Sequence, residues 1–185
     1  GAFLMLMRVK EETAEELAGF VLAVRETLPN IASQTADLDW SAYAGKRRHL
    51  PWFILSSLLL SENDIKVLMH GSAAHSASRV FAQDMLPLFS LAKANSFAEA
   101  EGQLQVRNFA YLSLEQFCPA LNSMIHLRNL MGLRSPVHTL VRLVNPLNAP
   151  YSIQGIFHPG YRPVHQDVFS SRRRHTRLTC DWSSD

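Results

Sequence analysis

Three short apolar runs, separated by helical patterns, constrain the fold of this chain most strongly. Residues 64–71 read as a buried strand that runs into a glycine turn, and residues 109–112 and 151–157 read as two further strands. Helical patterns lie around them, at residues 51–60, 76–88, 96–99, 113–132 and 136–144. Strands that alternate with helices favour an α/β fold with a mainly parallel sheet.

The N-terminal residues predict a helical hairpin. Residues 1–10 are apolar almost all round, which is typical of the end of a buried helix. The sequence Thr13-Ala-Glu-Glu16 is a capping box that starts a second helix, and Pro29 marks its end. We therefore expect residues 1–36 to be part of a small helical domain and residues 37–169 to be a partial α/β domain.

Residues 170–185 have no apolar periodicity and resemble the translated read-through of a sequencing adapter. We expect a non-native tail outside the fold, and a basic tail that binds nucleic acid is the alternative. The chain has 18 Lys and Arg against 16 Asp and Glu. Four Arg and two Asp lie in the tail, which leaves 14 basic and 14 acidic residues elsewhere. The net charge of +2 is therefore no indication of an acidic partner.

Cysteine and histidine usage bears on the cellular location and on the kinds of site that the chain could carry. Outside the tail Cys118 is the only cysteine, which agrees with a reducing, cytoplasmic location. The longest near-apolar run, residues 50–60, is too short to span a bilayer, so we expect no membrane partner. His70 and His75 fall on a predicted loop without carboxylates or thiols at ligand spacing, so no metal site is predicted. No nucleophile pattern stands out, and no catalytic residue is assigned.

A cationic and aromatic stretch from Asp39 to Trp52 precedes one of the predicted helices. Gly45 gives this stretch a flexible approach. Its cationic side chains are Lys46, Arg47, Arg48 and His49, and its rings are Trp40, Tyr43 and Trp52. Cations and rings just ahead of a helix N-terminus can form a platform for phosphates and bases. A solvated turn whose tryptophans pack inward fits the same residues equally well.

The ends of the predicted strands are the other candidate positions. Ligands of α/β sheets sit at the carboxyl ends of strands. That rule directs attention to three segments, His70-Gly71-Ser72, Gly132-Leu133-Arg134 and His158-Pro159-Gly160-Tyr161. Taken one at a time, each is more typical of ordinary turn chemistry.

Five segments together resemble the anthranilate phosphoribosyltransferase family. The run from Gly1 to Thr13 resembles the helical-domain signature, and Met69-His70-Gly71-Ser72 resembles the KHGN motif. The other three are Leu127–Arg134, Leu143–Pro146 and Gly155–Pro159. The match runs in order over nearly all of residues 1–160. It implies a phosphoribosyltransferase-like fold, a small helical domain beside an α/β domain, with both truncated because complete members are considerably longer at both ends.

The departures from the family pattern bear on function. Enzymes of the family hold the diphosphate of phosphoribosyl pyrophosphate on a GTGGD loop, and the stretch from Trp40 to Trp52 stands at that place. Ser72 and Ala73 replace an Asn and an Arg, His138 replaces an Asn, and Val141-Arg142 replaces a Gly-Pro. Arg128 matches the arginine that meets the anthranilate carboxylate. The acidic residues that hold Mg²⁺ would lie beyond residue 169.

These replacements resemble a divergent, YbiB-type branch of the family, whose members are often labelled glycosyl transferases. The resemblance implies non-specific binding of DNA or RNA by homodimers that form through the helical domain. In this hypothesis Lys46, Arg47 and Arg48 contact phosphates, and the three rings of the stretch stack on bases. Further cations, Arg128, Arg134 and Arg142, extend the positive surface. No cofactor is then required.

The second hypothesis is an active phosphoribosyl- or glycosyltransferase that uses phosphoribosyl pyrophosphate with Mg²⁺. The three consecutive cations would grip the diphosphate, and Arg128 would orient the acceptor. We rank it second because flexible side chains are less preorganised than a nest of backbone amides. A third possibility is that a chain truncated in this way has no activity of its own.

Overall fold

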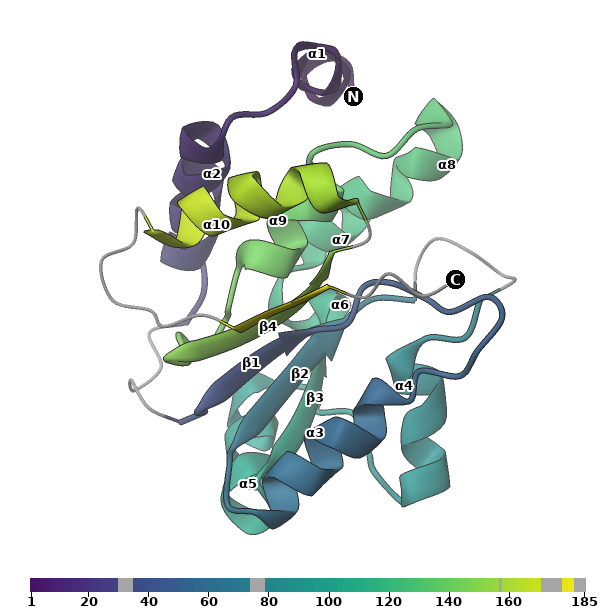
Figure 1. Ribbon diagram of the computed structural model, residues 1–185, viewed down its shortest axis with the longest axis vertical. Helices are drawn as coiled ribbons and strands as arrows, with labels where there is room; N and C mark the ends of the chain where they lie inside the picture. Colours follow the sequence, from purple (N-terminus) through teal and green to yellow (C-terminus); the bar gives the residue numbers. More distant parts are fainter. Residues whose placement is uncertain (30–34, 74–78, 157, 171–177, 182–185) are drawn as a thin grey trace.

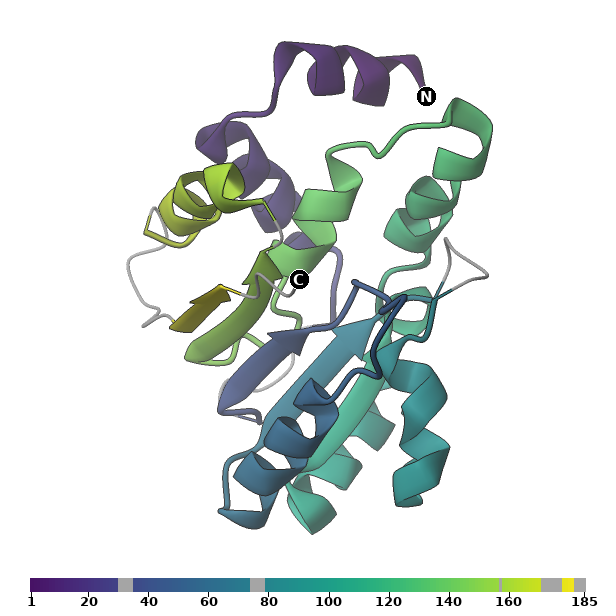
Figure 2. The ribbon, with the colours of Figure 1, turned by 45° about the vertical axis from the view of Figure 1, so that its right-hand side comes forward.

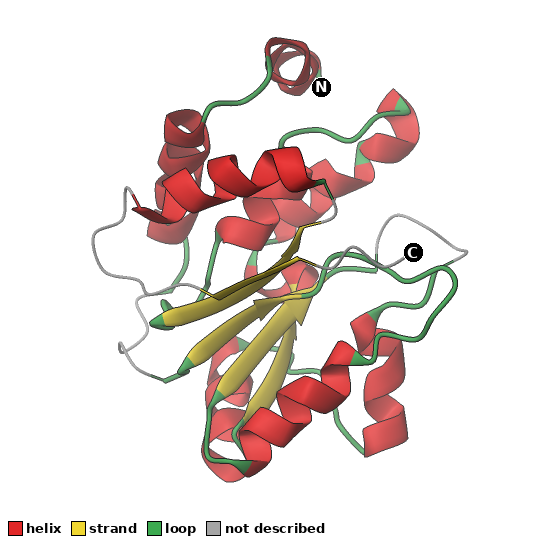
Figure 3. Cartoon of the chain, in the orientation of Figure 1, coloured by secondary structure: helices red, strands yellow, loops and turns green. Residues whose placement is uncertain are grey.

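The structure, a computed structural model, describes residues 1–29, 35–73, 79–156, 158–170 and 178–181. At its centre lies a parallel sheet in the order β3-β2-β1-β4-β5 (Figures 1 and 3). Its strands are β1 (Leu38–Ser41), β2 (Val67–Gly71), β3 (Phe109–Ser113), β4 (Tyr151–Ile156) and β5 (Leu178–Asp181). The predicted α/β class with a parallel sheet is confirmed.

Alternation along the strands divides the core between the two faces of the sheet. Leu68 of β2 and Leu112 of β3 face one hydrophobic cluster, whereas Met69 and Tyr111 face the other. Successive side chains of a strand point to opposite faces, so β2 and β3 contribute to both clusters. Burial on both faces is typical of parallel sheets and explains why these runs are almost continuously apolar.

Helices cover both faces (Figure 2). One face packs against α3 (Phe53–Glu62), α4 (Ala82–Met85) and the 3₁₀ helix η1 (Leu86–Phe89). The other face packs against α2 (Ala14–Glu26), α5 (Phe97–Arg107), α6 (Leu114–Phe117), α7 (Pro119–His126), α9 (Val137–Leu143) and α10 (Arg162–Ser170). Short helices α8 (Arg128–Met131) and η2 (Pro159–Tyr161) complete the loops at the carboxyl edge.

The N-terminal hairpin consists of α1 (Ala2–Lys10) and α2, as predicted. The prediction that the first helix is buried is wrong. Phe3, Leu6 and Val9 are 63–83% exposed, and only Met7 of this helix is buried. Figure 1 shows α1 at the far end of the molecule from the sheet, so an apolar helix face is left in solvent.

The capping box that starts α2 is confirmed. The Glu16 amide donates to Thr13 Oγ1 at 3.3 Å, and the Thr13 amide donates to Glu16 Oε2 at 3.0 Å. Each bond satisfies an amide that the first helical turn leaves without a backbone partner.

Thr13→Ala should therefore lower the free energy of unfolding by about 1 kcal/mol, because one of these amides loses its acceptor. Urea unfolding followed by circular dichroism measures this change. Thr13→Ser keeps the hydroxyl and should stay near the wild-type midpoint. Equal destabilisation by both variants would contradict the capping role.

The remaining helix predictions hold in part. Ser96 caps α5 by accepting from the Glu99 amide at 3.1 Å, and the pattern at residues 136–144 forms α9. The pattern at 113–132 divides into α6, α7 and α8, with Pro119 opening the second of them. Gly132 ends the last with φ of 70°, the left-handed conformation that suits glycine. The pattern at 76–88 forms only α4 and η1, and residues 76–78 lie outside the described part of the chain.

Four elements of the described chain were not predicted. These are β1, η2, α10 and β5. Residues Leu178–Asp181 were expected to lie outside the fold with the rest of the tail, but they pair with β4 as a parallel edge strand. Helix α10 packs against α2, which places residues near the end of the described chain beside the N-terminal hairpin. The domain boundary at residues 36 and 37 stays a prediction.

Candidate functional site

The loops that follow the strands gather at one edge of the sheet, because the strands are parallel. Residues 42–52 follow β1, Ser72 and Ala73 follow β2, and His158 lies beyond β4. Figure 2 shows the strand arrows converging on this carboxyl edge. The predicted site segments therefore do lie at a common edge.

The loop after β1 is held by its own backbone. The Ala42 amide donates to the His70 carbonyl at 2.7 Å, and the Lys46 amide donates to the Val80 carbonyl at 2.8 Å. Arg79 Nη1 donates to the Gly45 carbonyl at 3.0 Å. A Cβ on Gly45 would lie 2.7 Å from the Phe81 ring, so this glycine allows close packing rather than the flexible approach that we predicted.

A set of buried polar side chains links three strands behind this loop. Asp39 Oδ1 lies 3.1 Å from His70 Nε2, and Ser152 Oγ donates to Asp39 Oδ2 at 3.0 Å. Tyr43 Oη hydrogen bonds His70 Nδ1 at 2.9 Å. Asp39 and His70 have no solvent exposure. Burial raises the pKa of Tyr43 well above its usual value, so its hydroxyl stays protonated.

The three predicted stacking rings have different environments. Tyr43 is 4% exposed and edge-on to His70, so the prediction that it stacks on bases is wrong. Trp40 lies in β1 and stacks on Phe53, with ring centroids 6.1 Å apart. Trp52 is 57% exposed at the start of α3 and is the ring of the three that is most open to a ligand.

The segment His70-Gly71-Ser72 is also more buried than predicted. His70 belongs to β2, so the strand predicted at residues 64–71 includes it and its placement on a loop is wrong. Its ring lies edge-on to Phe117 and Tyr43. Ser72 Oγ donates to Asn122 Oδ1 at 3.1 Å. His75, the other histidine of that predicted loop, lies outside the described residues. This segment therefore supports the strand end from behind and presents little to solvent.

The consecutive cations do lie on the surface. Arg47, Arg48 and His49 are exposed, whereas Lys46 is half-buried and burial lowers its pKa. Their loop follows β1 directly, so these charges stand at the carboxyl edge of the sheet. The cationic platform stays a prediction, and the ring of Tyr43 points into the core.

More arginines from distant segments lie at the same edge. The pKa of Arg134 is lowered first by burial and then by the positive charges of Arg128 and Arg79. Mutual repulsion of this kind requires the three guanidinium groups to be near one another. Arg79 was not among the predicted site residues, and it links this group to the loop after β1 through its bond to Gly45.

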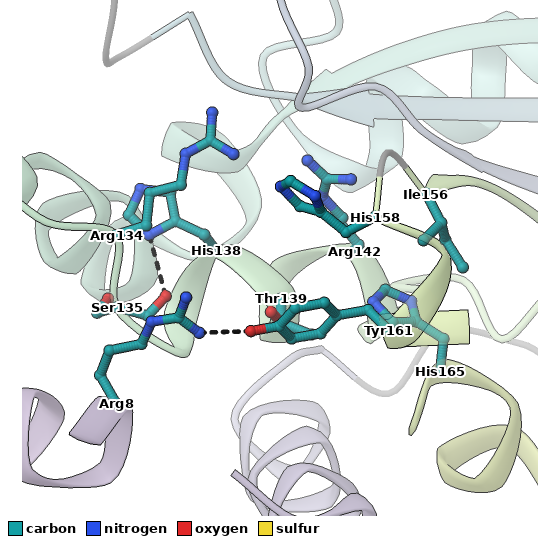
Figure 4. A pocket seen from close by; sticks show the side chains of 10 residues that line it. All are labelled: Arg8, Arg134, Ser135, His138, Thr139, Arg142, Ile156, His158, Tyr161 and His165. Atoms are coloured by element: carbon teal, nitrogen blue, oxygen red, sulfur yellow. Dashed lines mark hydrogen bonds between the residues drawn. The ribbon is translucent and has the colours of Figure 1, made fainter. Parts of the chain in front are cut away.

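A cavity of about 130 Å³ lies next to this group, between α1, α9, the end of β4, η2 and α10 (Figure 4). Arg142 was expected on the positive surface but lines this cavity, where Nη1 donates to the Gly155 carbonyl at 2.7 Å. Burial, followed by the charge of Arg134, lowers the pKa of Arg142 to about 10, so it remains charged at neutral pH. On another wall Arg8 Nη1 donates to Tyr161 Oη at 2.6 Å.

His138 lines the same cavity and is held neutral. Its pKa is lowered to about 4, chiefly by burial and then by Arg134, Arg128 and Arg142, although its bond to the Ser135 carbonyl opposes the shift. The unfolded chain would bind this proton near pH 6.5.

Lowering the pH from 7 to 5 should therefore destabilise the wild type more than His138→Gln. The unfolded state binds the proton in this range and the folded state does not, so stability is lost as the pH falls below about 6.5. We expect a difference on the order of 1 kcal/mol after allowance for solvent screening. Urea unfolding at the two pH values measures it, and identical losses in both proteins would contradict the shift.

Comparisons with known proteins agree with this architecture. Residues 1–28 match the helical bundle domain of the glycosyl transferase family. The chain is 25% identical over 166 residues to the Escherichia coli protein YbiB, covering 87% of this chain and 52% of that protein. It is 28% identical over 167 residues to the anthranilate phosphoribosyltransferase of Erythrobacter litoralis, covering 90% and 50%. The crystal structure of anthranilate phosphoribosyltransferase from Thermus thermophilus superposes with a TM-score of 0.83 at 19% identity, over 98% of this chain and 55% of that one.

These findings support an anthranilate phosphoribosyltransferase-like scaffold for this chain. The chain spans about half the length of the curated relatives that it matches.

The likeness to anthranilate phosphoribosyltransferases makes the loop after β1 the informative difference. In the family pattern this place holds glycines whose free amides bind a diphosphate. Here the amides of Ala42 and Lys46 are bonded to neighbouring backbone, and Tyr43 fills the space behind them. At this place the chain presents cationic side chains in place of free glycine amides.

Within the described residues, no group of three or more His, Cys, Asp or Glu side chains is placed to hold a metal ion. In that same part of the chain, no helix has the length and apolar character needed to cross a membrane.

Several functional side chains became visible only in three dimensions. Arg8 was seen only as part of a helix signature, and Arg79 and His165 were not singled out. His158 and Tyr161 were noted as a strand-end segment, and both line the cavity. Four of these five residues lie in or beside a segment that follows a strand, and Arg8 is the exception. Comparing the segments that follow the predicted strands could therefore have found the other four.

Proposed function

We propose that this chain is part of a non-specific nucleic-acid-binding protein built on the anthranilate phosphoribosyltransferase-like scaffold. The observation that carries the proposal is the loop after β1. Its amides at Ala42 and Lys46 are already bonded, while Arg47 and Arg48 are exposed beside the open ring of Trp52. Side-chain cations next to an exposed ring suit a phosphate backbone with stacked bases.

The surrounding arginines enlarge this surface. Arg79 donates a hydrogen bond to the Gly45 carbonyl of the loop. Arg128 lies close enough to Arg134 for its charge to lower the pKa of Arg134. Repulsion within such a group is relieved when phosphates approach. Association through many weak phosphate contacts requires no base-specific pocket, which is why we propose binding without sequence preference.

The double variant Arg47→Ala/Arg48→Ala tests the proposal. Fluorescence anisotropy with labelled single-stranded DNA, repeated over a range of salt concentrations, gives log K against log salt. For a single strand each lost phosphate contact should reduce the slope by about 0.7, so the slope should flatten by about 1.4.

A matched control removes two cations from the opposite edge of the sheet. Lys66 precedes β2 and Arg107 precedes β3, so Lys66→Ala/Arg107→Ala changes the net charge equally. This control should keep the wild-type slope. Equal flattening in both double variants would show a general charge effect and would remove the proposed interface.

Phosphoribosyl transfer is the second candidate, because related proteins of the family are named for that activity. The bonded amides after β1 weigh against a family-type diphosphate site. Displacement of the labelled DNA by phosphoribosyl pyrophosphate, with and without Mg²⁺, would favour the transferase.

The proposal includes a homodimer formed through the helical domain. The outward apolar side chains of α1, Phe3, Leu6 and Val9, support such a contact because they would be removed from water. Two copies would also double the number of phosphate contacts. The molar mass from light scattering tests this part of the proposal.

A further inference from the structure

The cavity beside the proposed interface is lined by basic side chains and by no described carboxylate. Its walls come from α1, α9, the end of β4, η2 and α10, and none of the described residues that line it is Asp or Glu. Three arginines and three histidines line it, namely Arg8, Arg134, Arg142, His138, His158 and His165. Arg8 Nη1 also lies 3.9 Å from Glu12 Oε1. Among the described residues that line the cavity, basic side chains are therefore not matched by carboxylates.

The guanidinium groups of Arg142 and Arg8 each donate one hydrogen bond to a neighbour, and other N–H donors remain. Arg142 uses Nη1 on the Gly155 carbonyl, and Arg8 uses Nη1 on Tyr161 Oη. A guanidinium carries five N–H donors in a fixed plane, so each keeps further N–H groups beyond these bonds. Figure 4 shows Arg134 and Arg142 on opposite sides of the cavity, with Arg8 and Tyr161 along a third side.

A buried hydroxyl gives a second, independent indication of a ligand. Ser135 lines the cavity and is 3% exposed, and its Oγ has no hydrogen-bond partner among the described residues. Buried polar groups are almost always hydrogen bonded, and leaving one without a partner is unfavourable. An anion with several acceptor atoms would satisfy this hydroxyl together with the arginines.

We propose that this cavity binds one phosphate monoester group. A tetrahedral dianion offers acceptors in several directions, which suits donors that arrive from α1, α9 and the loop before it, whereas a planar carboxylate offers two oxygens in one plane. The volume of about 130 Å³ is below the roughly 300–1,000 Å³ of pockets that bury whole small ligands. The cavity therefore takes the charged group and leaves the rest of the molecule outside.

The monoester has two possible sources, the terminal phosphate of a nucleic-acid strand or a free phosphorylated small molecule. Only the first rests on the proposed function. Backbone phosphates are diesters that carry a single charge and two substituents, so they fit the enclosed cavity less well than a terminal group.

Titration calorimetry with methyl phosphate tests the site directly. We expect methyl phosphate to bind to the wild-type protein, and dimethyl phosphate and acetate to bind at least about tenfold more weakly. Arg142→Gln should weaken methyl phosphate about tenfold or more, because a charge-assisted hydrogen bond is lost. Because Arg142 is mostly buried, Arg8→Gln on the exposed helix α1 serves as a second variant and should weaken binding in the same direction.

Arg25→Gln is the matched control. Arg25 is a partly buried arginine that donates to Asn148 and lies outside the cavity lining, so this variant should keep wild-type affinity. Absence of methyl phosphate binding at about 10 mM, or equal binding of acetate, would overturn the proposed site. Equal weakening by Arg25→Gln would overturn it as well.

Labelled single strands with a 5′-phosphate or a 5′-hydroxyl distinguish the two sources. A preference for the 5′-phosphate that is lost in Arg8→Gln assigns the site to strand ends. Methyl phosphate binding without such a preference assigns it to free phosphorylated molecules. If single strands bind and methyl phosphate does not, the cavity proposal fails while the proposed function stands. If methyl phosphate binds and single strands do not, the proposed function fails while the cavity proposal stands.

Discussion

Replacing Asp39 with alanine should lower the free energy of unfolding by about 3–5 kcal/mol, the largest effect expected from any polar residue of the chain. The carboxylate lies between Ser152 Oγ, which donates to it at 3.0 Å, and His70 Nε2 at 3.1 Å, with no exposure to solvent. Alanine would leave the Ser152 hydroxyl buried without its acceptor, which is destabilising by about 1–3 kcal/mol, and would remove the carboxylate beside His70 Nε2. It would also open a cavity between β1, β2 and β4. Urea unfolding followed by circular dichroism measures the loss.

Asp37→Ala is the control for this variant. Asp37 lies two residues earlier, is half-buried, and accepts one hydrogen bond from the Lys66 amide at 2.8 Å. Its loss should lower stability by about 1 kcal/mol. Similar values for the two variants would mean that the buried polar group joining the three strands contributes little.

Replacing Gly71 with alanine should also be severe, at about 3 kcal/mol. A Cβ at this position would lie 2.5 Å from the Ala42 carbonyl oxygen and 2.7 Å from Tyr111 Oη. The first contact is with backbone that is itself tied to β2 through the Ala42 amide, so it cannot move aside without breaking that bond. We expect a lower melting temperature together with weaker nucleic-acid binding, because the loop that carries Arg47 and Arg48 begins at Ala42.

Gly155→Ala provides the matched comparison. Gly155 also lies within a strand, and a Cβ there would meet no atom of the described residues within 4 Å. This variant should be neutral or slightly stabilising, because alanine lowers the conformational entropy of the unfolded chain. A melting temperature for Gly71→Ala as high as that of Gly155→Ala would contradict the close approach of β1 and β2.

Local sequence signals predicted much of the fold. Thr13 and Ser96 cap their helices as expected, because a cap depends on atoms only three residues apart. Buried parallel strands such as β2 and β3 are continuous apolar runs, which are visible in the sequence. Gly132 ends its helix for a reason that is equally local, its positive φ.

Features that depend on distant partners were predicted less well. Strand β1 was missed because a carboxylate in its centre reads as a loop residue, and only its partners His70 and Ser152 explain why it is buried. Tyr43 was read as a surface ring because its neighbours are cations, yet it packs on His70. Helix α1 looked buried from its composition, but no described segment covers its outer face.

The same distinction between local and distant signals applies to the residues of the candidate site. The exposed cations at Arg47 and Arg48 follow from their own sequence, since consecutive charges have few ways to be buried. The cavity does not, because Arg8 and Tyr161 are 153 residues apart and meet only when α1 and η2 are brought together. Its charge is a property of the assembled fold, and no single segment of the sequence contains it.

The central position of β1 has a consequence for biosynthesis. Its partner on one side, β2, is translated soon afterwards, but its partner on the other side, β4, carries Ser152, which is 113 residues beyond Asp39. At roughly 5–20 residues per second, a ribosome takes about 5–20 s to deliver that strand. Throughout this interval one side of β1 in the nascent chain is an unpaired strand edge with a carboxylate that has no hydroxyl partner, and such an edge can pair with the wrong strand. The order of this sheet therefore leaves a central strand with one unpaired edge in the emerging chain until β4 has been added.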